Sequence, residues 1–224
     1  MDLQKLKKLN LGINIFDVTD PAFESYGEIL DSRSFNAYFD YLRHQTAVPP
    51  TMNQYIAHDQ AIMQTFKDND LLNHIFNKTS LQYGYVNGNN SVLNALEFHH
   101  CPEINLALTP LVLMLGKTQD IEDGKYDTKR IKAFYIPENT VVLLYSSTLH
   151  FSPCKVSDEG FKCGVILPYG TNMVFITPEE KKQANDKLWF KTNKWLIAHP
   201  ENRTLLDLGA FPGLIGENLM IHYK

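Results

Sequence analysis

The sequence lacks the features that mark secreted and membrane-spanning proteins. Its 224 residues include only three cysteines, Cys101, Cys154 and Cys163, and an odd number at irregular spacing does not form a disulfide framework. No run of 18 apolar residues occurs, and no charged-then-apolar leader opens the chain, so we expect neither a membrane span nor secretion. These absences favour a reducing, cytoplasmic location in which the three thiols stay free.

The sequence also lacks any concentration of positive charge. It holds 21 basic and 25 acidic residues, which gives a net charge of −4, and no basic block is present. A nucleic-acid surface is therefore not expected. Internal repeats and low-complexity segments are absent too, while 44% hydrophobic and 21% charged residues are normal for a folded protein. We expect one compact domain, since this length suits a single β-barrel with helical additions.

The first 80 residues have the apolar spacing of helices. Phe35, Tyr38, Phe39 and Leu42 recur at intervals of three and four, and Ser34 is a candidate cap for this helix. Further helices are predicted over residues 3–9, 59–66 and 70–76. We expect residues 1–80 to form a helical extension packed on the rest of the chain.

From Leu81 the pattern changes to short apolar or alternating runs separated by turn residues. Such spacing predicts a barrel or sandwich of mostly antiparallel strands over residues 81–176. The predicted strands cover residues 81–86, 92–99, 104–108, 111–115, 131–136, 140–145, 150–156, 162–167 and 173–176. Pro178 then begins a helix, and residues 177–224 are expected to form a C-terminal helical segment. Its Trp189 and Trp195 are expected to pack on the barrel, with a sugar site as the alternative.

A cluster of potential metal-binding or proton-handling side chains lies between Glu97 and Glu103. In a β-strand, the odd positions Glu97, His99, Cys101, Glu103 and Asn105 share one face, and the opposite face is mostly apolar. An ordinary solvated face is the alternative interpretation. The polar face, however, carries ligand-type groups instead of Lys, Thr or Ser, which favours a metal or catalytic cluster.

We predict that Glu97, His99, Glu103 and His150 bind one divalent cation. Mixed imidazole and carboxylate ligation suits Mn, Fe and Zn ions, and two carboxylates would offset a 2+ charge. Mn²⁺ is favoured, with Fe²⁺ or Zn²⁺ as alternatives. Taken alone, His150 has apolar neighbours and would be read as a core histidine hydrogen-bonded to the backbone.

The spacing Glu97-x-His99-x-x-x-Glu103 resembles the first motif of the cupin superfamily, with Glu97 where that motif has its first histidine. The segment from Ala133 to Pro153 is similar to cupin-fold ureidoglycolate lyases. It is also similar to the second metal-binding motif of cupin sugar isomerases of the lyxose and sulfoquinovose isomerase types. The resemblance covers roughly residues 80 to 170 and implies a mainly β, cupin-like double-stranded β-helix barrel with one metal at its mouth, flanked by N-terminal and C-terminal helices.

This resemblance implies a metal-dependent aldose–ketose isomerase that acts on a sugar or sugar acid through an enediolate. A base must reach two adjacent carbons of the substrate. Glu103, if it is not a ligand, is the first candidate, and Tyr85, Lys132 and Tyr145 are the others. Two alternatives stay open: a lyase or hydrolase acting on a small ureido or keto acid, and a non-catalytic sugar-binding cupin. We also expect a small-molecule sugar as the substrate and a homodimer as the oligomeric state.

Overall fold

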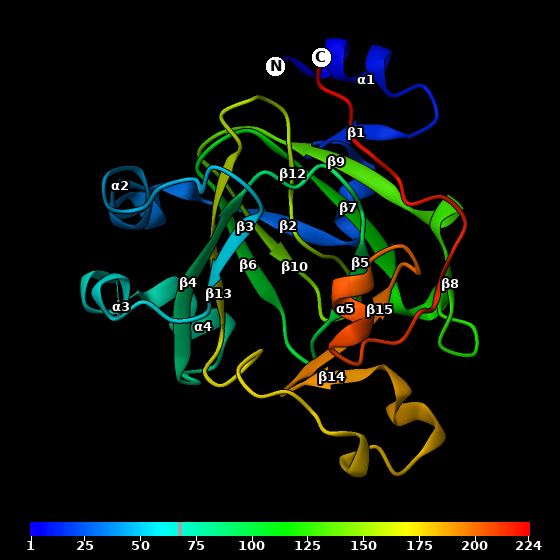
Figure 1. Ribbon diagram of the computed structural model, residues 1–224. Coiled ribbons are helices and arrows are strands. Elements are labelled where there is room, and N and C mark those ends of the chain that lie inside the picture. Colours follow the sequence, from blue (N-terminus) through cyan, green and yellow to red (C-terminus); the bar gives the residue numbers. More distant parts are fainter. Residues whose placement is uncertain (67–68) are drawn as a thin grey trace.

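The computed structural model describes residues 1–66 and 69–224, with the side chains of all of these except residues 184 and 185. Two β-sheets face each other in the centre of Figure 1. The first contains, in spatial order, β1 (Ile15–Asp17), β9 (Lys132–Ile136), β7 (Leu111–Lys117) and β11 (Thr148–Leu149), with β12 (Cys154–Lys155) also paired to β7. The second contains β2 (Gly27–Leu30), β10 (Thr140–Leu144), β6 (Glu103–Ala107), β13 (Phe161–Pro168), β4 (Leu81–Gly88) and β3 (Asn53–Ile56).

Apolar side chains from both sheets fill the space between them. Val142 and Leu144 of β10 meet Leu113 of β7 in this core, while the alternate residues Val141 and Leu143 pack on the outside of the second sheet. All five residues of β6 are buried, and its apolar Ile104 and Leu106 pack on the outer side of the second sheet, while Glu103 and Asn105 alternate with them. The prediction of a mainly β fold with mostly antiparallel strands is confirmed.

Three helices cover the outer face of the second sheet: α2 (Asn36–Gln45), α3 (Gln60–Phe66) and α4 (Asp70–Ile75). They lie beside β4 and β13 in Figure 1, where Tyr38 and Phe66 pack with Ile104 and Ile166. The predicted buried face of α2 is correct, but Ser34 is not its cap. Asp31 caps the preceding 3₁₀ turn by accepting a hydrogen bond from the backbone N–H of Arg33.

The N-terminal and C-terminal segments contain more strand than the sequence predicted. Within residues 1–80, β1, β2 and β3 extend the two sheets, so this region is not purely helical. In the C-terminal segment, β14 (Trp189–Lys191) and β15 (Lys194–Ala198) join β5 (Ala95–Phe98) in a third sheet. A 3₁₀ turn over Pro178–Glu180 replaces the helix predicted there, and α5 (Arg203–Asp207) is short. The prediction of a helical C-terminal segment is therefore wrong.

The reason lies in strand pairing. Trp195, Leu196, Ile197 and Ala198 pair with the four residues of β5, so the open edge of β5 selects an extended backbone for them. The strand predicted over residues 173–176 does not form, and Phe175 makes a single bridge to Lys191. The predicted strand over 150–156 is interrupted as well, because β12 begins at Cys154.

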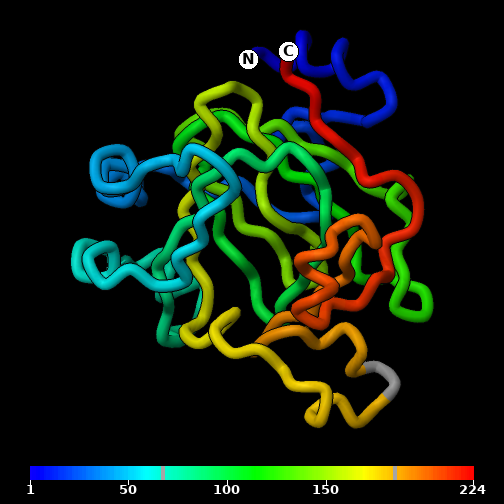
Figure 2. Tube along the Cα trace, viewed as in Figure 1, coloured from blue at the N-terminus to red at the C-terminus, as the bar shows by residue number. Residues whose placement is uncertain are grey.

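The two ends of the chain lie side by side, as Figure 2 shows. The Asn10 amide, just after α1 (Leu3–Leu9), donates a hydrogen bond to the backbone carbonyl of His222 and accepts one from its N–H, at 2.7 and 2.8 Å. The three cysteines are free, as predicted. Among the described residues, no helix combines the length and apolar character needed to cross a membrane.

Candidate metal centre

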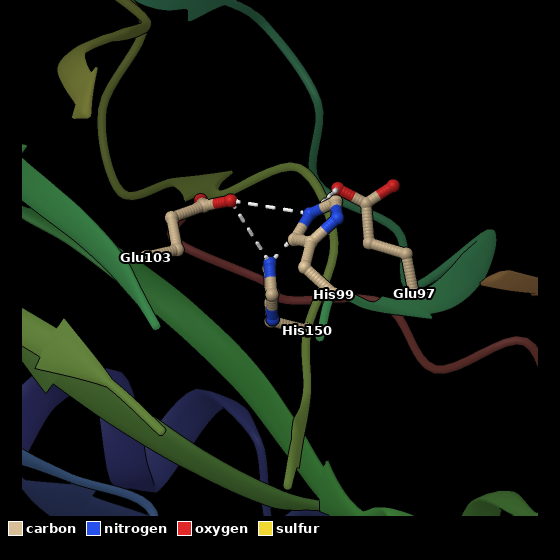
Figure 3. A group of neighbouring side chains, drawn as sticks. All are labelled: Glu97, His99, Glu103 and His150. Carbon is tan, nitrogen blue, oxygen red and sulfur yellow. Dashed lines mark hydrogen bonds and ion pairs between the residues drawn. The ribbon is translucent and has the colours of Figure 1, made fainter. Parts of the chain in front are cut away.

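The side chains of Glu97, His99, Glu103 and His150 converge (Figure 3). All four side chains are buried, and each offers one ligand-type atom that lies within 4.8 Å of the other three. The structure therefore brings together the four residues that the sequence singled out. Their arrangement comes from three separate segments of the chain.

The backbone explains how these segments meet. Glu97 and His150 face each other across an antiparallel bridge, in which the Glu97 N–H donates to the His150 carbonyl at 2.6 Å and the His150 N–H returns a bond at 2.9 Å. Residues opposite each other in such a pair place their side chains on the same face. Glu103 arrives differently, because β5 ends at Phe98 and a turn containing Pro102 leads into β6. The break agrees with the separate strands predicted over residues 92–99 and 104–108, so Glu97 and Glu103 do not lie on one face of a single strand.

Both imidazoles are oriented by backbone carbonyls. His99 Nδ1 lies 2.7 Å from the carbonyl oxygen of Asn193, and His150 Nδ1 lies 3.0 Å from that of Thr148. Because a carbonyl only accepts, Nδ1 carries the hydrogen in each ring, and Nε2 points into the cluster. Metal-binding histidines in proteins are commonly fixed in this way.

The distances around Nε2 describe a compact donor set. Glu103 Oε2 lies 3.4 Å from His99 Nε2 and 3.2 Å from His150 Nε2. Glu97 Oε1 is more distant, at 3.7 and 4.0 Å from the same two atoms. His99 Nε2 is buried, and its polar neighbours are the two carboxylate oxygens at 3.4 and 3.7 Å. Two nitrogens and two carboxylates around one point fit a divalent Mn, Fe or Zn ion.

The cluster shifts the ionisation of its members. Burial alone would raise the pKa of Glu97, but the Lys194 charge and the two imidazoles outweigh it and lower this pKa to about 2. For Glu103, too, burial is outweighed, by His150 and His99, and its pKa falls well below its usual range. The two carboxylates overcome the effect of burial on His99 and raise its pKa to about 9. The metal-free cluster therefore holds a proton that a bound cation would displace.

Lys194 is a site residue that sequence reasoning missed. It begins β15, and its ammonium group pairs with Glu97 Oε2 while its side chain is only 12% exposed. Asn193, directly before it, has a φ of 50° in the β14–β15 hairpin and supplies the carbonyl that orients His99. No local motif marks these two residues. The sequence signal that could have found them is the hairpin turn that follows the Trp-containing strand β14.

A cavity of about 220 Å³ opens beside the cluster. Its polar lining includes Asn105, whose amide donates to Glu103 Oε1 at 2.7 Å, and Asn172, whose amide donates to the Tyr55 hydroxyl at 3.1 Å. The cavity is lined by Asn53, Tyr55, Val86, Glu97, Glu103, Asn105, Phe151, Ser152, Pro153, Val165, Asn172 and Lys194. It therefore places hydroxyl and amide groups next to the four ligand-type side chains.

The other predicted catalytic residues do not line this cavity. Tyr85 packs with the helices on the outer face of β4, and Lys132 lies over the ring of Phe16. Tyr145 is 38% exposed, just after the end of β10. Of the four predicted catalytic residues, Glu103 therefore lies at the site and the other three lie elsewhere.

Two further residues near the cluster have packing roles. Burial raises the pKa of the Cys101 thiol to about 11, and the Asn193 amide donates to its sulfur at 3.2 Å. Trp195 stacks on His100 with ring centroids 4.0 Å apart, and on Phe98 at 5.5 Å. The packing interpretation of this tryptophan therefore agrees with its contacts.

The fold and the four converging side chains define a mainly β protein with a candidate metal centre. Residues 15–219 match the family described as "Domain of unknown function (DUF4867)", and the chain belongs to this family. No curated protein sequence matches the chain.

Among solved structures, the chain is similar to oxalate decarboxylase from Bacillus subtilis. A structure described as holding Mn(II) centres matches at 10% identity and a TM-score of 0.33, over 52% of this chain and 25% of that chain. Another, described as determined at pH 4.6, matches at 12% identity and a TM-score of 0.35, over 57% and 28%. The match spans about a quarter of the decarboxylase chain. A similarity of this extent carries no argument about activity.

Proposed function

We propose that this protein is a metal-dependent isomerase that interconverts an aldose and a ketose, or the corresponding sugar acids. The observation that carries the proposal is the pair of imidazoles whose Nε2 atoms, fixed by backbone carbonyls, point at two buried carboxylates beside a polar cavity. Such a donor set would hold one divalent cation, with Mn²⁺ favoured because oxygen ligands make up half of the set. The cation would supply polarisation of a carbonyl and the adjacent hydroxyl.

Glu103, His99 and His150 form the tight part of the proposed metal site. Glu103 Oε2 faces both imidazoles, and its other oxygen is engaged by Asn105. Because Glu103 Oε2 faces both imidazoles, we propose Glu103 as a ligand rather than the base.

Glu97 is the carboxylate with an oxygen directed away from the imidazoles. Its Oε1 faces the cluster, whereas its Oε2 faces Lys194 at the cavity wall. We assign to Glu97 Oε2 the transfer of the proton between two adjacent carbons of the substrate, a task that requires a base within reach of both. Lys194 keeps this carboxylate ionised.

The second candidate is a lyase or hydrolase acting on a small polar acid. The ammonium group of Lys194 and the small volume of the cavity favour it. A cytoplasmic homodimer stays a prediction, and light scattering can test its dimeric state.

The direct test is a reaction panel with metal-loaded protein. Aldoses, ketoses and their uronic acids are incubated in deuterated water and followed by NMR, with ureidoglycolate in a parallel series and a metal-depleted sample as the control. Interconversion of a sugar pair, with deuterium entering the carbon next to the carbonyl, is the expected result. Turnover of ureidoglycolate alone would replace the isomerase by the second candidate, and sugar binding without turnover of any compound would indicate a binding protein.

A further inference from the structure

The charged groups of the cavity do not cancel when a divalent cation is bound. Among the cavity-lining residues, only Glu97, Glu103 and Lys194 carry charge. Metal-bound histidines are neutral, so a 2+ ion and the two carboxylates sum to zero. Lys194 then leaves the site with one uncompensated positive charge.

The Lys194 ammonium group, which carries this charge, lies in a poorly hydrated part of the protein. Glu97 and Glu103 are 8% and 6% exposed, and Lys194 is 12% exposed at its side chain. Burying a net charge is costly unless a counter-charge lies nearby. In the metal-free protein Glu97 supplies that counter-charge to Lys194. A bound cation would share the same carboxylate, so Glu97 would no longer neutralise the ammonium group in full.

We infer that the substrate is a monoanion, and that Lys194 binds its carboxylate next to the metal site. This inference rests on the proposed function and narrows it to sugar acids, or to small hydroxy or keto acids, in place of neutral sugars. Neutral groups supply the rest of the lining: Asn53, Tyr55, Ser152 and Asn172 offer hydroxyls and amides suited to the uncharged part of such a molecule.

The test compares matched ligands that differ in charge. Binding of D-glycerate and of glycerol to Mn²⁺-loaded protein is measured by calorimetry, and glucuronate and glucose form a second pair. Wild-type protein is expected to bind the acid of each pair more tightly. Lys194→Met is expected to weaken glycerate binding about 10- to 100-fold, the range of a charge-assisted hydrogen bond. Lys194→Arg is expected to retain the preference for the acid.

Two variants serve as controls. Lys194→Gln is neutral but can still donate to Glu97 Oε2, so it separates the loss of charge from a loss of folding. Lys191→Met removes a nearby charge that lies over the ring of Phe175 and does not line the cavity, and it should bind glycerate like the wild type. Metal content and melting temperature are recorded for every variant.

The outcomes separate this inference from the proposed function. Protein that takes up no metal would overturn both. Metal-loaded protein that binds glycerol as well as glycerate, or a Lys194→Gln variant that keeps the wild-type glycerate affinity, would overturn the monoanionic substrate alone.

Discussion

The pH dependence of the metal-free protein follows from the buried histidine–carboxylate cluster. Glu97 and Glu103 raise the pKa of His99 from 6.5 to about 9. A group whose pKa is higher in the folded state stabilises the fold fully below its unfolded value, and this contribution is lost as pH rises through the folded value. For His99 the window lies between pH 6.5 and pH 9. Metal-free protein should therefore become less stable as pH rises across this window.

The magnitude follows from the pKa difference. A change from 6.5 to about 9 corresponds to about 3 kcal/mol of unfolding free energy. For a chain of 224 residues this lowers the melting temperature by roughly 5–15 °C. Calorimetry of chelator-treated protein across the window measures it, with His99→Gln as the control that lacks the titrating ring. Mn²⁺-loaded protein should not show the loss, because the cation replaces the proton. A melting temperature that stays constant, or a His99→Gln variant with the same slope, would refute the reasoning.

The remaining predictions concern the ligands and their support. Glu103→Gln should lower Mn²⁺ affinity at least about 100-fold, because Glu103 Oε2 contacts both imidazoles. Glu97→Gln should lower the same affinity by a factor about tenfold smaller, since Glu97 Oε1 is more distant from the imidazoles. Competition with a chelator measures both, and equal losses would contradict this ranking. Asn193→Ala should weaken Mn²⁺ binding about 10- to 100-fold, because it strains the left-handed backbone that orients His99. Asn193→Gly tolerates this conformation and should bind nearly normally; a loss equal to that of the alanine variant would assign the effect to the side chain instead.

The sequence predicted the candidate metal-binding cluster because its first three members are close along the chain. These three residues meet although they do not share one face of a single strand. Pro102 lies in a turn between β5 and β6, two strands that belong to different sheets, and the turn brings Glu103 back toward His99. Local spacing thus indicated which residues meet, while the path between them depended on strand pairing.

Which face of a strand points inward was not predictable where both faces are apolar. On β4, Val86 faces the barrel core, whereas Tyr83 and Tyr85 face the helices. A shift of one residue in register exchanges the two sets, so a candidate base such as Tyr85 could not be placed from the sequence.

Long-range pairing also explains why Lys194 was missed. Its approach to Glu97 depends on β15 joining the edge of β5, almost a hundred residues earlier in the chain. The same holds for Tyr55 and Asn172, whose contact joins β3 to the loop after β13. Helices with a clear apolar face, such as α1 over Leu3–Leu9, were predicted well because their signal is local.

The central claim is that Glu97, His99, Glu103 and His150 bind one divalent cation. Elemental analysis of purified protein beside His150→Ala tests it most directly, with the melting temperature as a check that both proteins are folded. The wild type should carry one equivalent of metal per chain, with Mn²⁺ preferred over Zn²⁺ when both are offered. His150→Ala should fold and lose the metal, because it removes a buried Nε2 that lies 3.2 Å from Glu103 Oε2. A folded His150→Ala protein with full metal occupancy would contradict the account.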